Sequence, residues 1–205
     1  MQNKSVQQDI ESIRQLMERS VRFVSLSGLS GILAGIYALI GAAFAYQQIY
    51  SGDAVRTVEY YRGHFPIVKS LFVIAALVLA ASLATGWLFS YRKSKRLNAK
   101  MWDSTSKRLL INLGVPLCVG GFFTLVLVDY GYYNLVAASV LLFYGLALIN
   151  ASANLYDEVR YLGYCELAVG VFAALFPGFG LYFWAVGFGL LHILYGSLMY
   201  SKYDR

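Results

Sequence analysis

Six long stretches nearly free of charged side chains limit the possible fold most. A helix needs about 20 mostly apolar residues to cross a hydrocarbon core about 30 Å thick. The 205 residues are 59% apolar and 14% charged, whereas soluble domains are about 45–50% apolar and about 25% charged. A membrane barrel is not expected, because its strands alternate apolar and polar residues, whereas these stretches are apolar at both odd and even positions. The sequence predicts an all-α polytopic membrane protein with six transmembrane helices, at about 23–46, 68–91, 109–128, 134–152, 160–176 and 181–201.

Lys and Arg are unevenly distributed among the connecting segments. Fourteen lie before the first stretch, between the second and third, between the fourth and fifth, or after the sixth; the other side has Arg56, Arg62 and Lys69. Because basic loops stay in the cytoplasm, both termini are predicted to be cytoplasmic in a bacterial inner (plasma) membrane. The tail 202–205 then follows a transmembrane domain at 23–201. This orientation explains the net charge of +6 without nucleic-acid binding.

Residues 1–22 form a polar cytoplasmic segment without the apolar core of a cleavable signal peptide. Within it, residues 4–22 show apolar positions at steps of three and four, which predicts an amphipathic helix: Val6, Ile10, Ile13, Met17 and Val21. One interpretation is a helix lying at the bilayer surface. The other is a docking helix for a cytoplasmic protein partner, since its polar face carries charges of both signs.

Tight turns at 129–134 and 177–180 predict two antiparallel helical hairpins. The first two stretches are predicted to form another, so the chain has three hairpins. The second and third hairpins match at an offset of 49 residues, for example Gly131 with Gly180. Glycines seven residues apart share a helix face and let helix backbones approach closely in lipid. The predicted packing glycines are Gly28, Gly35, Gly114, Gly121, Gly163, Gly170, Gly189 and Gly196.

The Gly-rich hairpins, notably from Gly163 to Gly196, resemble small bacterial six-helix membrane proteins of the HdeD-like, acid-resistance type. The segment Trp-Ala-Val-Gly-Phe-Gly-Leu-Leu-His-Ile-Leu-Tyr-Gly at 184–196 is similar to a family of uncharacterised bacterial membrane proteins. The resemblance implies a six-helix bundle and supplies no activity.

Recognisable catalytic motifs are missing from the sequence. The two histidines, His64 and His192, are predicted to lie at different depths, whereas a catalytic metal normally needs three protein ligands. No HExxH, P-loop or GxSxG motif occurs. Cys118 and Cys165 fall inside predicted helices with no metal spacing. We therefore expect no cofactor, no metal and no enzymatic activity.

Glu166 and His192 form the candidate site. Each lies about 13 residues from the 177–180 turn, which is about 18–20 Å of helix, on helix faces that carry packing glycines. An unpaired carboxylate in lipid is costly, so the two side chains are predicted to meet, directly or through one water. The pair is either a structural polar contact or a proton-responsive switch. Possible supporting polar residues are Asn112, Tyr144, Asn150 and Tyr195.

Two functions fit these features. The first is a membrane sensor or accessory protein that couples the lipid bilayer to a cytoplasmic protein partner through residues 4–22. The alternative is a small-solute or proton transporter or channel that uses Glu166 and His192, in which a homo-oligomer could enlarge the pore.

Overall fold

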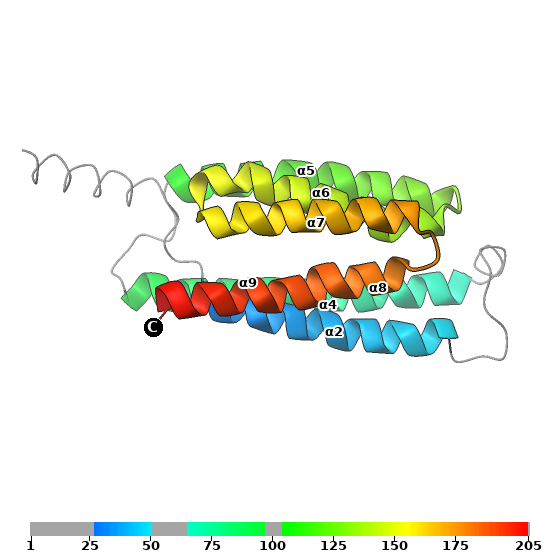
Figure 1. Cartoon of the computed structure of the whole chain (residues 1–205), viewed down its shortest axis with the longest axis horizontal. Helices are drawn as coiled ribbons and strands as arrows, with labels where there is room; N and C mark the ends of the chain where they lie inside the picture. Colours follow the sequence, from blue (N-terminus) through cyan, green and yellow to red (C-terminus); the bar gives the residue numbers. More distant parts are fainter. Residues whose placement is uncertain (1–26, 51–64, 97–103, 205) are drawn as a thin grey trace, which may run out of the picture.

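The chain forms a bundle of long helices (Figure 1). This computed structural model describes residues 27–50, 65–96 and 104–204, and in these ranges it contains no strand. The long helices are α2 (Gly28–Tyr50), α4 (Phe65–Arg96), α5 (Ser104–Asp129), α6 (Val136–Ala151) and α7 (Asp157–Leu175). The C-terminal helix consists of α8 (Gly180–Trp184), the π-helical segment η3 (Ala185–Leu191), α9 (His192–Met199) and η4 (Tyr200–Asp204). Short 3-10 turns, η1 (Tyr133–Leu135) and η2 (Ser152–Asn154), flank α6.

Five helices are long and apolar enough to cross a membrane, which confirms an all-α protein with membrane-length helices. They are Gly28–Tyr50, Ile67–Arg96, Thr105–Asp129, Tyr133–Ala151 and Gly180–Tyr203. The predicted fifth span, α7, has 19 residues but carries Asp157, Glu158, Arg160 and Glu166, which make it less apolar. The sixth crossing therefore stays a prediction. The amphipathic helix predicted at 4–22 lies outside the described residues.

The helices form two layers (Figure 1). In one layer α6 packs between α5 and α7, and in the other α2 packs between α4 and the C-terminal helix. The layers meet where the C-terminal helix packs on α6 and α7. Thus α7 and the C-terminal helix, the predicted third hairpin, pack mainly on α6 and α2 rather than on each other. The junction between the layers is where the candidate site lies.

A glycine ends α5 and turns the chain toward α6. Gly131 has a φ of 78°, a conformation that glycine adopts without steric cost. The Tyr132 N–H donates to the Leu127 carbonyl and the Gly131 N–H donates to Val128, which is the bonding pattern of a Schellman motif. This turn supplies donors for carbonyls that the helix end would otherwise leave unpaired.

The turn after α7 uses a different register from the one predicted by the repeat. Here Gly178 has the positive φ, 102°, and follows Pro177, while the Phe179 N–H donates to the Phe176 carbonyl at 3.3 Å. Proline followed by a positive-φ glycine is typical of a type II turn. Gly180, which matched Gly131 in the sequence, instead begins α8, so the two turns are not structural copies.

Four predicted glycines form the contact between α2 and the C-terminal helix. A Cβ added to Gly196 would lie 2.4 Å from the Ile32 backbone nitrogen, and one added to Gly35 would lie 2.6 Å from the Gly189 carbonyl oxygen. Gly28 also meets the backbone of α9 and η4. Because a side chain does not fit at these positions, the two backbones touch, which is how helices associate without a hydrophobic driving force in lipid.

The glycine prediction holds for α7 and is wrong for α5. Gly163 and Gly170 pack closely against α6. By contrast, a Cβ added to Gly114 or Gly121 would meet no described atom within 4 Å. The packing glycine of α5 is Gly120, whose added Cβ would lie 2.3 Å from Phe143. Since α5 packs against α6 along one face only, a step of one residue, about 100° around the helix, turns Gly121 away from that face.

We expect Gly196→Ala to destabilise the bundle and Gly121→Ala to leave it intact. The first substitution forces atoms apart at a backbone contact, and overpacking costs about 1–3 kcal/mol. The second adds a methyl group where there is room, and alanine favours helix over glycine by about 1 kcal/mol. Thermal unfolding in detergent measures both variants. Equal loss of stability in the two would contradict the assigned helix contact.

Candidate functional site

Glu166 is enclosed in the middle of the protein. Its side chain on α7 is 0% exposed, and it is among the largest fully buried side chains, with Leu141 and Met199. Within the described residues, neither carboxyl oxygen has a hydrogen-bond partner. Burying a charge without a partner is costly in an apolar interior. The site therefore favours the uncharged carboxylic acid unless a partner moves toward it.

Gly187 makes the space for this carboxyl group. A Cβ added to Gly187 would lie 2.6 Å from Glu166 Oε2 and 2.4 Å from Leu141 Cδ2. Any other residue at this position would therefore displace the carboxyl group or the leucine. The sequence prediction did not include Gly187, although the run Gly187-Phe188-Gly189 shortly before His192 was a signal for close packing.

His192 has a defined partner at each ring nitrogen. Its Nε2 lies 2.8 Å from the Tyr144 hydroxyl oxygen, and its Nδ1 lies 3.0 Å from the Gly187 carbonyl oxygen. A carbonyl only accepts hydrogen bonds, so Nδ1 carries the proton. In a neutral imidazole, Nε2 then accepts from Tyr144. The arrangement thus selects one of the two histidine tautomers.

The predicted pair meets, but not through a direct hydrogen bond. Nδ1 of His192 lies 3.5 Å from Oε1 of Glu166. This distance permits an electrostatic interaction, yet the N–H points to the nearer Gly187 carbonyl, so both oxygens of Glu166 lack a donor. We call Glu166, His192, Tyr144 and Gly187 the Glu166 cluster.

Aromatic rings enclose the imidazole. The Tyr144 ring is stacked on His192 with 5.4 Å between centroids, and Phe188 is stacked at 5.9 Å. Trp184 continues this row, 5.4 Å from Phe188. Tyr195, predicted as a supporting residue, is partly buried against the apolar core formed by α6 and α7. Tyr144 and Phe188 also contact each other, with 5.1 Å between centroids, so the three rings form one aromatic cluster.

The π-helical segment η3 ends directly before His192. The backbone N–H of His192 donates to the Gly189 carbonyl, while its ring N–H donates to the Gly187 carbonyl, five residues back. The side chain therefore occupies a carbonyl that backbone hydrogen bonds would use in a regular helix. π-Helical segments are frequent at functional sites. The sequence predicted one uninterrupted helix at 181–201 and gave no indication of this segment.

Asn112 and Asn150 lie apart from the Glu166 cluster and have a structural role. Pro116 stands inside α5, and because proline has no N–H it cannot bond the Asn112 carbonyl four residues earlier. The Asn150 amide on α6 donates to this carbonyl at 2.8 Å. Neighbouring helices commonly satisfy carbonyls freed by proline in a membrane.

A double-mutant cycle tests this compensation. Asn150→Leu alone should lower the free energy of unfolding by about 1 kcal/mol. In a Pro116→Ala background the loss should be smaller, because the alanine supplies the missing N–H. Unfolding in mixed micelles measures the coupling. If Asn150→Leu has the same cost in both backgrounds, the amide does not compensate for the proline.

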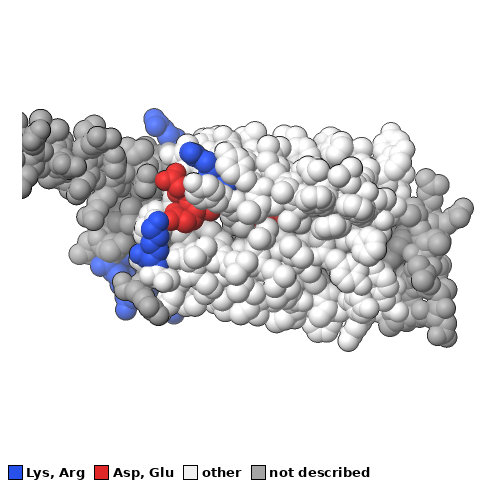
Figure 2. Space-filling view, viewed as in Figure 1, with Lys and Arg blue, Asp and Glu red and all other residues white. Residues whose placement is uncertain are grey.

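Charged side chains gather at one end of the bundle (Figure 2), where α5 and α7 begin and η4 ends. There Lys202 Nζ lies 2.5 Å from Glu158 Oε1, and the Tyr203 hydroxyl donates to the same oxygen. Burial alone would raise the pKa of Glu158, but these hydrogen bonds lower it overall. The contact fastens the end of the C-terminal helix to the start of α7.

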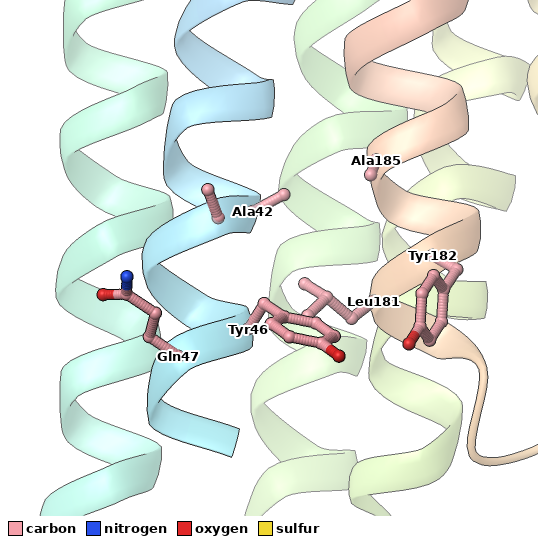
Figure 3. Close-up of a pocket in the computed structure, with 7 residues that line it drawn as sticks. Ala42, Tyr46, Gln47, Leu181, Tyr182 and Ala185 are labelled. Carbon is pink, nitrogen blue, oxygen red and sulfur yellow. The ribbon is translucent and has the colours of Figure 1, made fainter. Parts of the chain in front are cut away.

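A shallow pocket of about 410 Å³ lies between α2 and the start of the C-terminal helix (Figure 3). Its walls are mainly apolar, with Tyr46, Gln47 and Tyr182 near one end. Residues of the Glu166 cluster do not line it. An apolar groove of this kind, without convergent polar groups, does not specify a ligand.

No family model, curated protein or solved structure matches this chain. The HdeD-like resemblance therefore stays a prediction. Among the described residues, no group of three or more His, Cys, Asp or Glu side chains could hold a metal ion.

Proposed function

We propose that the protein is a proton-responsive membrane sensor or accessory protein, without catalytic chemistry of its own. The observation that carries this proposal is the fully buried Glu166, whose carboxyl group lies 3.5 Å from the ring of His192. A buried carboxyl without a hydrogen-bond donor stabilises little, so a purely structural role accounts poorly for it. Protonation changes its charge in an apolar interior, where charge has a large effect on helix packing.

The proposed topology has six crossings in three hairpins, in a bacterial inner membrane with both termini cytoplasmic. Five membrane-length apolar helices and successive helices of alternating direction (Figure 1) support it. The concentration of Lys and Arg at one end (Figure 2) supports the orientation. In this arrangement, residues 4–22 contact a cytoplasmic protein and pass on the state of the Glu166 cluster.

A second candidate function is proton or small-solute transport. The specific observation in its favour is η3, a helix irregularity placed directly against Glu166. Transporters commonly build their sites from interrupted helices. Against it, Leu141 and Gly187 enclose Glu166, so a solute has to separate helices to reach the carboxyl group, whereas a proton does not.

Partner capture from native membranes tests the sensor. The full chain should retain the same protein reproducibly, in an amount that changes with pH, and deletion of residues 2–20 should abolish capture but not membrane insertion. Glu166→Gln should capture the partner independently of pH. Glu158→Gln, the same substitution on the same helix outside the cluster, should keep the pH dependence.

Flux into proteoliposomes separates the two functions. We expect proton and solute flux to stay at the level of protein-free vesicles. Flux that is lost in Glu166→Gln and kept in Glu158→Gln would replace the sensor by the transporter. Failure of the full chain to retain any protein reproducibly would contradict the sensor.

A further inference from the structure

We propose that a proton bound at Glu166 determines whether His192 donates to Gly187 or to Glu166, and thereby sets the helical form of Ala185–Leu191. The inference rests on the proposed function for its biological use, and it names how the same site is regulated. The ligand of the site is the proton itself. In the step, the Glu166 carboxyl group releases one proton to solvent. A hydrogen bond from His192 to Glu166 then replaces the one from His192 to Gly187.

Two acceptors compete for one N–H. His192 Nδ1 lies 3.0 Å from the Gly187 carbonyl oxygen and 3.5 Å from Glu166 Oε1. While Glu166 holds its proton, both acceptors are neutral and the nearer carbonyl keeps the bond. A carboxylate forms roughly twice as strong a hydrogen bond as a neutral acceptor, and Glu166 has no other donor among the described residues. Loss of the proton therefore draws the N–H to Glu166.

The shift frees the Gly187 carbonyl in an apolar interior. A buried carbonyl requires a new partner, and in an α-helix that partner is the N–H four residues later, at Leu191. Re-pairing changes the segment from i+5 to i+4 bonding. A shift of one residue in the bonding register changes the phase of the chain ahead of the segment by up to about 100°, the rotation per residue of an α-helix.

The rotation appears on the α8 side of the segment. Gly28 and Gly196 hold α9 against α2 by backbone contacts that leave no space for a side chain. By contrast, α8 is a helix of only five residues between the turn at Gly178 and η3. Trp184, the last residue of α8, therefore changes its position relative to Phe188, its ring neighbour at 5.4 Å.

Few other ionisable groups face the Glu166 cluster. Tyr144, itself part of the cluster, comes from α6, and Tyr195 comes from α9. α8 carries only Tyr182, and α2 carries tyrosines but no Asp, Glu, Lys, Arg or His. The remaining charged residues of α7 lie six or more positions before Glu166, and those of α5 lie near its ends. Glu166 is therefore the carboxyl group, and His192 the imidazole, among the described side chains at this site.

Trp184 fluorescence tests the proposal directly. In a Trp87→Phe, Trp102→Phe background, Trp184 is the remaining tryptophan. The purified protein in lipid nanodiscs should show a sigmoidal change in emission and in quenching by brominated lipid as the pH is raised through the titration of Glu166. Glu166→Gln should abolish the change, because a neutral amide does not attract the N–H as a carboxylate does. Glu158→Gln in the same background should keep it.

A constant Trp184 signal in the folded parent, or an unchanged transition in Glu166→Gln, would overturn the proposal. If Glu166→Gln does not fold, infrared difference spectra of the parent decide. The carbonyl band of a protonated carboxyl group should disappear over the pH range of the fluorescence change, and a band that persists would overturn the switch.

Neither measurement depends on partner capture or flux. A Trp184 transition without a partner would reject the sensor alone, whereas pH-dependent capture with a constant Trp184 signal would reject the switch alone.

Discussion

The burial of one carboxyl group between two layers of helices is the constraint on which the centre of this protein depends. Glu166 fits only because Gly187 has no side chain, and the same glycine supplies the carbonyl that His192 binds. Tyr144 then fixes the other ring nitrogen. Each of these side chains comes from a different part of the chain, so the cluster exists only when α6, α7 and the C-terminal helix pack together.

Around this centre, close contacts at glycines join the helices in addition to clusters of buried apolar side chains. In lipid the hydrophobic effect does not favour helix association, so small residues and polar bonds have to do so. Gly28 and Gly196 bring α2 against α9, and Gly163 brings α7 against α6. The Asn150 amide adds a polar bond between α5 and α6.

The helices and the meeting of Glu166 with His192 could be predicted from the sequence. Membrane length is encoded in the apolar stretches, and depth follows from counting residues away from a turn. The direction in which a glycine face points is not encoded in this way. Gly121 shares its seven-residue spacing with Gly170, but only the second faces a neighbouring helix, because the neighbours of α5 and α7 differ.

The π-helical segment could not be predicted for a similar reason. Across a helix contact from it, the Glu166 carboxyl group and the His192 ring share the space beside Gly187. No local pattern in 181–201 records the position of a side chain on α7. Likewise, the main partners of α7 and the C-terminal helix are α6 and α2, which adjacency in the sequence did not indicate for the predicted third hairpin.

The protonation of the His192 ring nitrogens tests the central claim most directly. The chain has two histidines, so ¹⁵N-histidine labelling of a His64→Gln variant in lipid gives a spectrum of His192 alone. At pH 8 the account predicts a proton on Nδ1 and a bare Nε2 that accepts from Tyr144, with a shift of the Nε2 signal in Tyr144→Phe. A bare Nδ1 with the proton on Nε2 would contradict Nδ1 as the donor to Gly187 or Glu166, and with it the arrangement of the Glu166 cluster.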